Sequence, residues 1–266
     1  MKKLFSLLVV LITTTCLWAY DIQVGDLCYN LDDSNYTAEV TQQSYSSNYS
    51  GLTYVVIPES INSYGSTYSV TSIDDYAFKN CSALNAIIIP NSVMSIGKET
   101  FSHCSALTSI VWNARKYKNF YSSYDNPFCN IRSQITSFAF GDSVEHIPAH
   151  LCNGMNNLTS VTIPISVTSI ADWAFQNCSA LTSITIPERV TSIGEYSFNG
   201  CTALTSIIWN ATDYSTWDKT NHCPVSPFYE IRSQITSFIF GEKVEHIPAA
   251  ICCGMKNLTS VTIPNG

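Results

Sequence analysis

Histidine is the side chain in this sequence best suited to acid–base or metal chemistry, and its five copies are scattered: His103, His146, His150, His222 and His246. His146 and His246 each follow a glutamate in a Val-Glu-His-Ile-Pro stretch. Adjacent residues of a strand point to opposite faces of a sheet, so neither Glu-His pair is expected to act as a dyad. The repeat described below would hold these two histidines roughly 20 Å apart, too far for a shared metal. We expect both to lie on the surface.

Nucleophilic cysteine chemistry finds equally little support. His222 and Cys223 are adjacent, but neighbouring residues rarely orient as base and nucleophile, and no third group to orient them is evident. Cys252 and Cys253 are also adjacent, and a bridge between them would be strained. The chain contains no Cys-x-x-Cys, His-Glu-x-x-His, Gly-x-Gly-x-x-Gly or Gly-x-Ser-x-Gly motif. We therefore expect no catalytic residue, no metal site and no cofactor, and a protein that is not an enzyme.

Four other cysteines share one slot in a recurring phrase. Each lies three residues after a phenylalanine and three before a leucine: Cys81, Cys104, Cys178 and Cys201. Free cysteine packs as a small apolar side chain, so this placement predicts a buried ladder of cysteines. Stacked neighbours would lie about 4.8 Å apart, a spacing at which a disulfide is conceivable but geometrically demanding.

The recurring phrase is Leu-x-x-Ile-x-Ile-Pro, as at 84–90 and 181–187, with Asn or Gly replacing the proline in some copies. The last apolar residue of each copy falls at positions 57, 89, 112, 140, 163, 186, 209, 240 and 263, so the basic unit has 23 residues and three copies carry insertions. The Ile-x-Ile alternation predicts a short strand with one buried face, which proline ends because it cannot donate to a sheet. One unit cannot bury its apolar face alone, so about nine units must stack.

A second half-motif completes most units. A Val-x-x-Ile stretch, as at 70–73 and 190–193, is followed by a turn and an apolar anchor such as Phe78 or Phe198. The stretch Ile-Arg-Ser-Gln-Ile-Thr-Ser-Phe also occurs twice, at 131–138 and 231–238, so a block of four units recurs. The pattern predicts a β-rich solenoid of short strands, turns and short helical segments. Block duplication favours growth of an array over one unique active site.

The phrases Asn-Cys-Ser-Ala-Leu-Thr-Ser-Ile-Thr-Ile-Pro at 177–187 and Val-Thr-Ser-Ile-Gly-Glu-Tyr-Ser-Phe at 190–198 resemble the BspA-type leucine-rich repeats. That family has the same period and occurs on secreted and surface proteins of host-associated anaerobic bacteria and some parasitic protists. The resemblance covers residues 51–266 and implies a β-rich, α/β-like leucine-rich-repeat solenoid outside the cell. Family members are associated with adhesion to host matrix proteins, host cells or other bacteria.

The chain divides into three expected parts. Residues 1–19 predict a secretory signal peptide, because two lysines precede a short apolar run that ends near a small residue. Residues 20–50 resemble the capping segment that precedes such arrays, and residues 51–266 form the solenoid. No later apolar stretch approaches the length of a transmembrane span. We expect a secreted or cell-surface protein; a formal net charge of −7 without basic clusters argues against nucleic-acid binding.

Two loop insertions, at 114–127 and 211–227, interrupt the repeat at the same internal point and should emerge on one side of the solenoid. Their aromatic content is typical of contact sites. The candidate ligand-binding residues in them are Tyr117, Phe120, Tyr121, Tyr124, Tyr214 and Trp217. The alternative is that these rings fold back and pack beneath their own loops.

Threonine and serine recur at outward strand positions and form a second candidate surface. The residues expected to contact ligand there are Thr159, Thr162, Thr182 and Thr185. A flat array of hydroxyls can hydrogen-bond glycans or protein backbone, although threonine is also simply well suited to an exposed strand.

Together these features predict a non-catalytic binding protein, an adhesin for extracellular protein or glycan ligands such as host matrix proteins. The alternative is a structural scaffold that self-associates through an open C-terminal end, where the chain stops midway through a unit. The least favoured reading is a glycan-active enzyme, which needs two carboxylates about 5–10 Å apart in a cleft, whereas the acids here are scattered.

Overall fold

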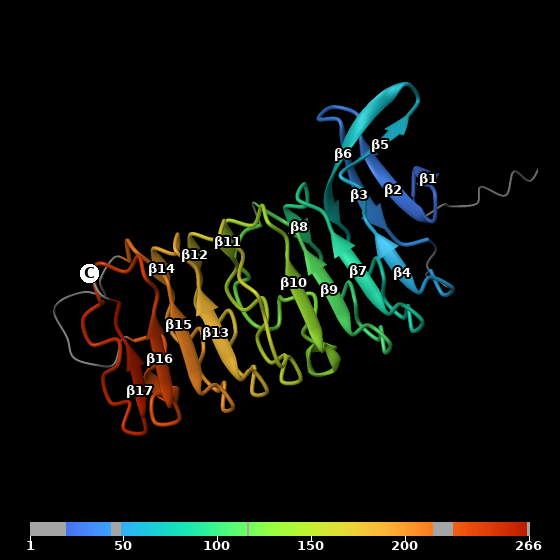
Figure 1. Ribbon diagram of the computed structural model, residues 1–266. Coiled ribbons are helices and arrows are strands. Elements are labelled where there is room, and N and C mark those ends of the chain that lie inside the picture. Colours follow the sequence, from blue (N-terminus) through green and yellow to red (C-terminus); the bar gives the residue numbers. More distant parts are fainter. Residues whose placement is uncertain (1–19, 44–48, 116, 215–225, 265–266) are drawn as a thin grey trace, which may run out of the picture.

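The protein is an elongated solenoid in the computed structural model, which describes residues 20–43, 49–115, 117–214 and 226–264. Figure 1 shows a sheet at the N-terminal end and repeats that follow one another toward the other end. The strands are β1 (Ile22–Val24), β2 (Leu27–Asp32), β3 (Thr37–Thr41), β4 (Tyr54–Val56), β5 (Ser60–Ser63), β6 (Ser66–Ile73), β7 (Ala86–Ile89), β8 (Ser95–Ile96), β9 (Ser109–Trp112), β10 (Ser137–Phe140), β11 (His146–Ile147), β12 (Ser169–Ile170), β13 (Ser183–Ile186), β14 (Ser192–Ile193), β15 (Ser206–Trp209), β16 (Ser237–Phe240) and β17 (Ser260–Thr262). Among the described residues, the 3-10 helices η1 (Arg132–Gln134) and η3 (Tyr229–Ile231) supply short helical segments.

An antiparallel meander forms the N-terminal end of the solenoid. β1, β2 and β3 pair in order, and β3 then pairs in parallel with β6 of the first repeat. β6 also pairs with β5 as a hairpin, which accounts for the extra residues between the first two copies of the repeat. Cys28, Tyr29 and Val40 of the meander are buried, so it covers the apolar end of the array. The exact boundaries expected for leader, cap and array remain predictions.

The Ile-x-Ile motif forms a row of parallel strands along one side. β4, β7, β9 and β10 make one four-stranded sheet, and β13, β15, β16 and β17 make another. Equivalent residues stack in register, as Ile87 does with Ile110 and Ile184 with Ile207. These isoleucines are buried and their neighbours point outward, as the alternation predicts.

One copy departs from the expected pattern. Residues 159–163 form no strand, and the row is divided there into its two sheets. The Thr182 N–H reaches the Thr159 carbonyl only at 3.4 Å, compared with 3.1 Å from Thr205 to Thr182 one repeat later. The backbones are therefore too far apart at this point for a regular ladder, and the expectation of a strand in every copy was wrong here.

Short Ser-Ile strands form a second row. β8 pairs with β6, and β11, β12 and β14 make a separate three-stranded sheet. The row is interrupted where the first insertion enters, between β8 and β11. It ends at β14, where the second insertion enters.

The third side of the solenoid is a ladder of turns. The Phe78 N–H donates to the Thr100 carbonyl at 3.0 Å, and the Phe175 N–H donates to the Ser197 carbonyl at 2.9 Å. Each of these bonds joins one repeat to the next. Buried backbone polar groups must find partners, so an isolated repeat would leave these groups unsatisfied.

Aromatic rings fill the core between the three rows. Phe101 stacks on Phe78 with centroids 5.6 Å apart and on Phe128 at 5.1 Å. Phe198 repeats the arrangement with Phe175, at 5.5 Å. The anchor phenylalanines therefore form two stacks of three inside the solenoid, Phe78–Phe101–Phe128 and Phe175–Phe198–Phe228, with the anchor Leu151 between them.

The predicted cysteine ladder is confirmed. Its four members are buried and free, and the thiol of Cys104 donates to the Phe78 carbonyl at 3.0 Å. Burial raises the pKa of the Cys178 thiol, which disfavours the reactive thiolate. Cys253 is disulfide-bonded whereas its neighbour Cys252 is free, so these two are not bridged to each other.

Replacing Phe101 by alanine should lower the free energy of unfolding by about 3–5 kcal/mol, because the fully buried ring leaves a cavity between two neighbours. Urea denaturation followed by circular dichroism measures the change. Met94→Ala, at a side chain 51% exposed, is the control and should shift stability by less than about 0.5 kcal/mol. Equal losses in both variants would contradict the stacked core.

Candidate functional site

A column of side chains follows the turn side of the solenoid, at a repeat position that the sequence analysis did not single out. Its members have φ values between 51° and 62°: Tyr76, Glu99, His150, Trp173, Tyr196 and Ala250. Residues with a Cβ adopt this left-handed region only at a cost in free energy. Its recurrence at one position indicates that the surrounding structure imposes it.

Bonds between repeats impose this conformation. The Trp173 N–H donates to the Glu195 carbonyl at 3.0 Å, and the Glu195 N–H donates to the Asp172 carboxylate at 2.7 Å. The Ser197 hydroxyl donates to backbone carbonyls of its own turn and of the preceding repeat. Tyr196 lies between these two anchored residues, so its side chain projects from a well-fixed turn.

Three rings of the column stack on one another. His150 and Trp173 have centroids 4.8 Å apart and planes inclined by 5°, and Trp173 and Tyr196 are 6.3 Å apart at the same inclination. Rings stacked in this way cover one another's faces. Tyr196 is the last ring of the stack and is 45% exposed, so its far side faces the next repeat uncovered by the stack.

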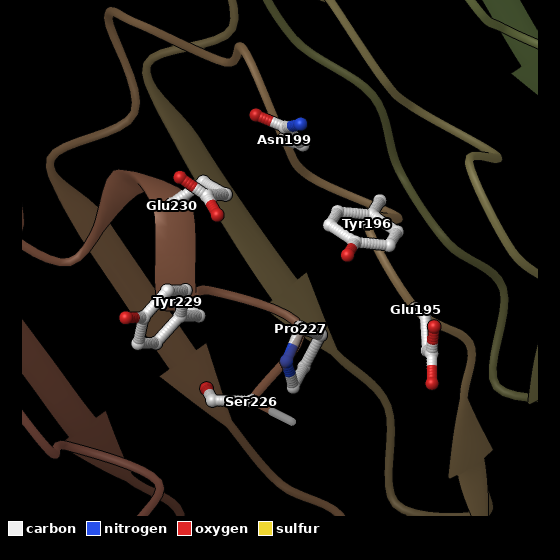
Figure 2. Close-up of a pocket in the computed structure, with 7 residues that line it drawn as sticks. All are labelled: Glu195, Tyr196, Asn199, Ser226, Pro227, Tyr229 and Glu230. Atoms are coloured by element: carbon white, nitrogen blue, oxygen red, sulfur yellow. The ribbon is translucent and has the colours of Figure 1, made fainter. Parts of the chain in front are cut away.

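A pocket of about 280 Å³ lies on that far side. Its lining residues are Glu195, Tyr196, Asn199, Ser226, Pro227, Tyr229 and Glu230. Figure 2 shows the first three on one side of an open space and the other four, from the following repeat, on the other side. Two tyrosine rings and a proline supply apolar walls, and two exposed glutamates lie at the rim.

The first insertion presents only two of its four candidate rings. Tyr121 and Tyr124 are 98% and 82% exposed. Tyr117 and Phe120 are buried, and their rings pack against each other at a centroid distance of 5.0 Å. The expectation that these two contact ligand is corrected, because the loop folds back and places them in the core.

Buried Tyr117 replaces a missing strand. Its hydroxyl accepts the N–H of Ile96, the last residue of β8, at 3.1 Å, while its ring meets Trp112 edge-on at 5.0 Å. Where the row of short strands is not interrupted, a strand of the next repeat occupies the place that Tyr117 occupies beside β8. Burial raises the pKa of Tyr117 to about 12, so the phenol stays protonated.

The second insertion repeats this arrangement. The Tyr214 hydroxyl accepts the N–H of Ile193, the last residue of β14, at 3.2 Å, and its ring meets Trp209 edge-on at 4.9 Å. Tyr214 is half-buried and packs against Trp209, and its expected role as a ligand contact remains a prediction. Trp217 lies outside the described residues.

The four candidate threonines are exposed, but the equivalent positions of the following strands do not all carry hydroxyl groups, so the threonines do not form a continuous hydroxyl face. The register places Thr185 beside Ile208, which is beside Ile239, which is beside Thr262. In the first sheet the same outward row reads Val56, Ile88, Val111 and Ala139. A row of serines runs next to it in the second sheet: Ser183, Ser206, Ser237 and Ser260. The outer face is therefore amphipathic, with hydroxyls beside apolar β-branched side chains.

His146 is half-buried at the outward position of β11, next to buried Ile147, and His246 is exposed. The His146 Nδ1 lies 2.7 Å from the Ser169 hydroxyl and the Nε2 lies 2.8 Å from the Asn119 side-chain oxygen. Asn119 belongs to the first insertion, whose loop covers β11. Burial lowers the pKa of His146, so the ring is held neutral.

The acids near this histidine do not activate it. The Glu145 carboxylate pairs with Arg115 at 2.5 Å.

Within the described ranges no three histidine, cysteine or acidic side chains gather closely enough to bind a metal ion. Over the same ranges no helix has the length and apolar character of a transmembrane span.

Comparison with known families agrees with the architecture. Six copies of the BspA type leucine rich repeat region match residues 44–126 and 122–220. The chain belongs to the BspA type leucine-rich-repeat family. The matched residues of this BspA type array include the stacked rings of the column and both tyrosines that replace strands.

Several solved bacterial leucine-rich-repeat proteins are similar to this BspA type chain. A leucine rich cell surface protein from Faecalibacterium prausnitzii A2-165 is 20% identical over 91% of this chain and 76% of its own, with a TM-score of 0.47. A leucine-rich repeat protein from Bacteroides ovatus ATCC 8483 is 22% identical over the same shares, with a TM-score of 0.34. The pneumococcal vaccine antigen PcpA is 13% identical over 85% and 88%, with a TM-score of 0.36. No curated protein matches. At these sequence identities and TM-scores the solved structures do not establish the family, so the family assignment rests on the match to the repeats themselves.

The structural role of the insertion tyrosines is testable by removing only their hydroxyls. Tyr117→Phe and Tyr214→Phe should each lower the free energy of unfolding by about 1–3 kcal/mol, because an N–H at the end of a strand loses its acceptor. Urea denaturation measures the change. Tyr121→Phe, at the exposed tip, is the matched control and should be neutral; unchanged stability of Tyr117→Phe would refute the strand-replacing role.

His146 should make stability depend on pH. Its pKa is lowered in the folded protein, so the unfolded chain binds a proton more readily below about pH 6.5. Stability is then full above that pH and falls as the pH drops, by at most about 1.4 kcal/mol for each unit by which the pKa is lowered. Denaturation at pH 7.5 and 5.5 should show a smaller difference for His146→Gln than for the unmodified chain. An identical difference would exclude His146 as the source.

Proposed function

We propose that this chain is a secreted or cell-surface adhesin, which binds host matrix proteins, host cells or glycans through multivalent, non-catalytic contacts. The observation that supports this most is the repeated outward display of contact-type side chains on one rigid array. Tyr121 and Tyr124 extend from the first insertion, and the outer strand face presents hydroxyls beside apolar side chains. The predicted leader at residues 1–19, which directs the chain outside the cell, lies outside the described residues.

Multivalency is the physical basis of the proposed binding. An exposed tyrosine, or a threonine or serine hydroxyl of the outer face, makes only a shallow, weak contact with a partner. When several contacts are held at fixed spacing on one scaffold, formation of one contact raises the effective concentration of the others. Weak contacts together therefore give strong avidity. The formal net charge of −7 favours partners that present basic surfaces.

Binding of residues 20–266 to immobilised matrix proteins and to a glycan array tests the proposal. Tyr121→Ser with Tyr124→Ser removes the exposed tip, and Thr162→Val with Thr185→Val removes two outward hydroxyls while keeping their shape. We expect binding by the unmodified chain and at least a tenfold loss in one of the two double variants. Circular dichroism verifies that both variants keep the fold.

Phe120→Leu, a change at a buried ring of the same loop, is the matched control and should bind normally. If no ligand binds the unmodified chain, the adhesin proposal fails. Concentration-dependent oligomers in sedimentation would then favour the scaffold alternative. Self-association through the C-terminal end remains a prediction.

A further inference from the structure

The N-terminal half of the array shows what the space between two column residues can hold. The ammonium group of Lys79 lies 4.5 Å from the ring centroid of Tyr76 and 2.8 Å from the carboxylate of Glu99. Tyr76 and Glu99 occupy the column position in consecutive repeats. A cation is therefore held between an aromatic ring of one repeat and a carboxylate of the next, an arrangement that both attractions stabilise.

The pocket beside Tyr196 is the corresponding space in a later pair of repeats, with Ser226 in the position of Glu99 and with carboxylates supplied instead by Glu195 and Glu230. Tyr196 occupies the position of Tyr76, and Asn199, three residues later, occupies the position of Lys79. Asparagine is neutral and too short to reach across. The rim carboxylates of Glu195 and Glu230 take part in no ion pair among the described residues. The ring and the negative charge are thus present, and among the described residues no side chain supplies the positive partner of these glutamates.

The geometry of the walls favours a planar cation. Tyr196 ends a stack of parallel rings, and a flat group inserted beside it continues that stack. The other tyrosine of the pocket already binds such a group outside the pocket: the guanidinium carbon of Arg232, which does not line the pocket, lies 3.7 Å from the ring centroid of Tyr229. Guanidinium groups stack on aromatic rings and bind carboxylates with several N–H groups, whereas an ammonium is a compact, strongly hydrated charge.

We propose that this pocket accepts an arginine side chain of an extracellular partner protein. The guanidinium stacks on the open face of Tyr196, and the carboxylates of Glu195 and Glu230 accept its N–H groups. This inference rests on the proposed binding function and specifies the chemistry of one contact in it. The acidic character of the whole chain favours the approach of such a basic side chain.

The first experiment uses N-acetyl-arginine methylamide as the probe and the full mature chain, residues 20–266. Ring signals of labelled tyrosine report binding by nuclear magnetic resonance. We expect saturable shifts of the Tyr196 and Tyr229 signals, and at least fivefold weaker binding of the neutral citrulline analogue. Glu195→Gln with Glu230→Gln should weaken binding by about threefold to tenfold. Glu59→Gln, an exposed acid in the first repeat, is the matched control and should change nothing.

The second experiment follows the arrangement of Tyr76, Lys79 and Glu99 in the N-terminal half of the array. Asn199→Lys should place an ammonium group beside Tyr196 as Lys79 does beside Tyr76, fill the pocket with the chain's own cation and abolish probe binding. Lys79→Ala should open the space between Tyr76 and Glu99 and add a second, weaker site at Tyr76. Asn199 is only half-buried, so the lysine variant should keep the fold, which circular dichroism verifies. Undiminished probe binding by a folded Asn199→Lys variant would overturn the proposal.

The matrix-protein assay separates this inference from the proposed function. If a matrix protein binds and Asn199→Lys weakens that binding, both are supported. If it binds the variant and the unmodified chain equally, the adhesin proposal holds and the arginine pocket is not used. If the probe binds the pocket but no matrix protein binds, the pocket chemistry is supported and the adhesin proposal fails. Absence of probe shifts overturns the arginine pocket whatever the matrix protein does.

Discussion

Backbone N–H and C=O groups of one repeat find their partners in the next repeat, and the rest of the structure depends on this constraint. The bonds recur on all three sides, from the Ile-x-Ile strands through the Ser-Ile strands to the turns. A single unit would expose both its polar backbone and its apolar face, so neither is stable without neighbours. Stacking also explains why phenylalanine, cysteine and isoleucine recur at fixed positions, since each packs on its own counterpart.

The two insertions show what happens where this ladder is interrupted. A terminal strand N–H still needs an acceptor, and the hydroxyls of Tyr117 and Tyr214 supply it. Asn119 does the same just after the end of β11, because its side-chain oxygen accepts the Ala149 N–H at 2.9 Å. Much of the described aromatic and polar character of the insertions is therefore structural, and in the first insertion the tip, with Tyr121 and Tyr124, is exposed for contacts with a partner.

The column of side chains on the turn side arises from the same constraint. The sequence pattern did not predict it, and the reason is clear. Its members are of five different residue types, so a search for recurring letters passes over them. A signal was present, because Tyr76, Trp173 and Tyr196 all lie two residues before an anchor phenylalanine. Their exposure and mutual stacking, however, follow from the left-handed turn, and that turn is held by bonds to the adjacent repeat. The pocket at Tyr196 forms where the following repeat places no ring in the column.

The sequence by itself determined the period, the inward face of the strands and the burial of the cysteine ladder, because each depends on alternation within one unit and on copies of that unit stacking. It did not determine which rings of the insertions are exposed. Tyr117 and Tyr121 are the same residue type in the same loop, and the packing of the folded loop buries the first and exposes the second. Nor did it indicate that residues 159–163 form no strand, which follows from a small increase in spacing between two backbones. The pocket likewise needed the tertiary structure, because its walls come from two repeats whose lining residues are separated in the chain by an insertion. Local patterns encode local conformation, whereas loop packing and pockets depend on contacts between residues far apart in the sequence.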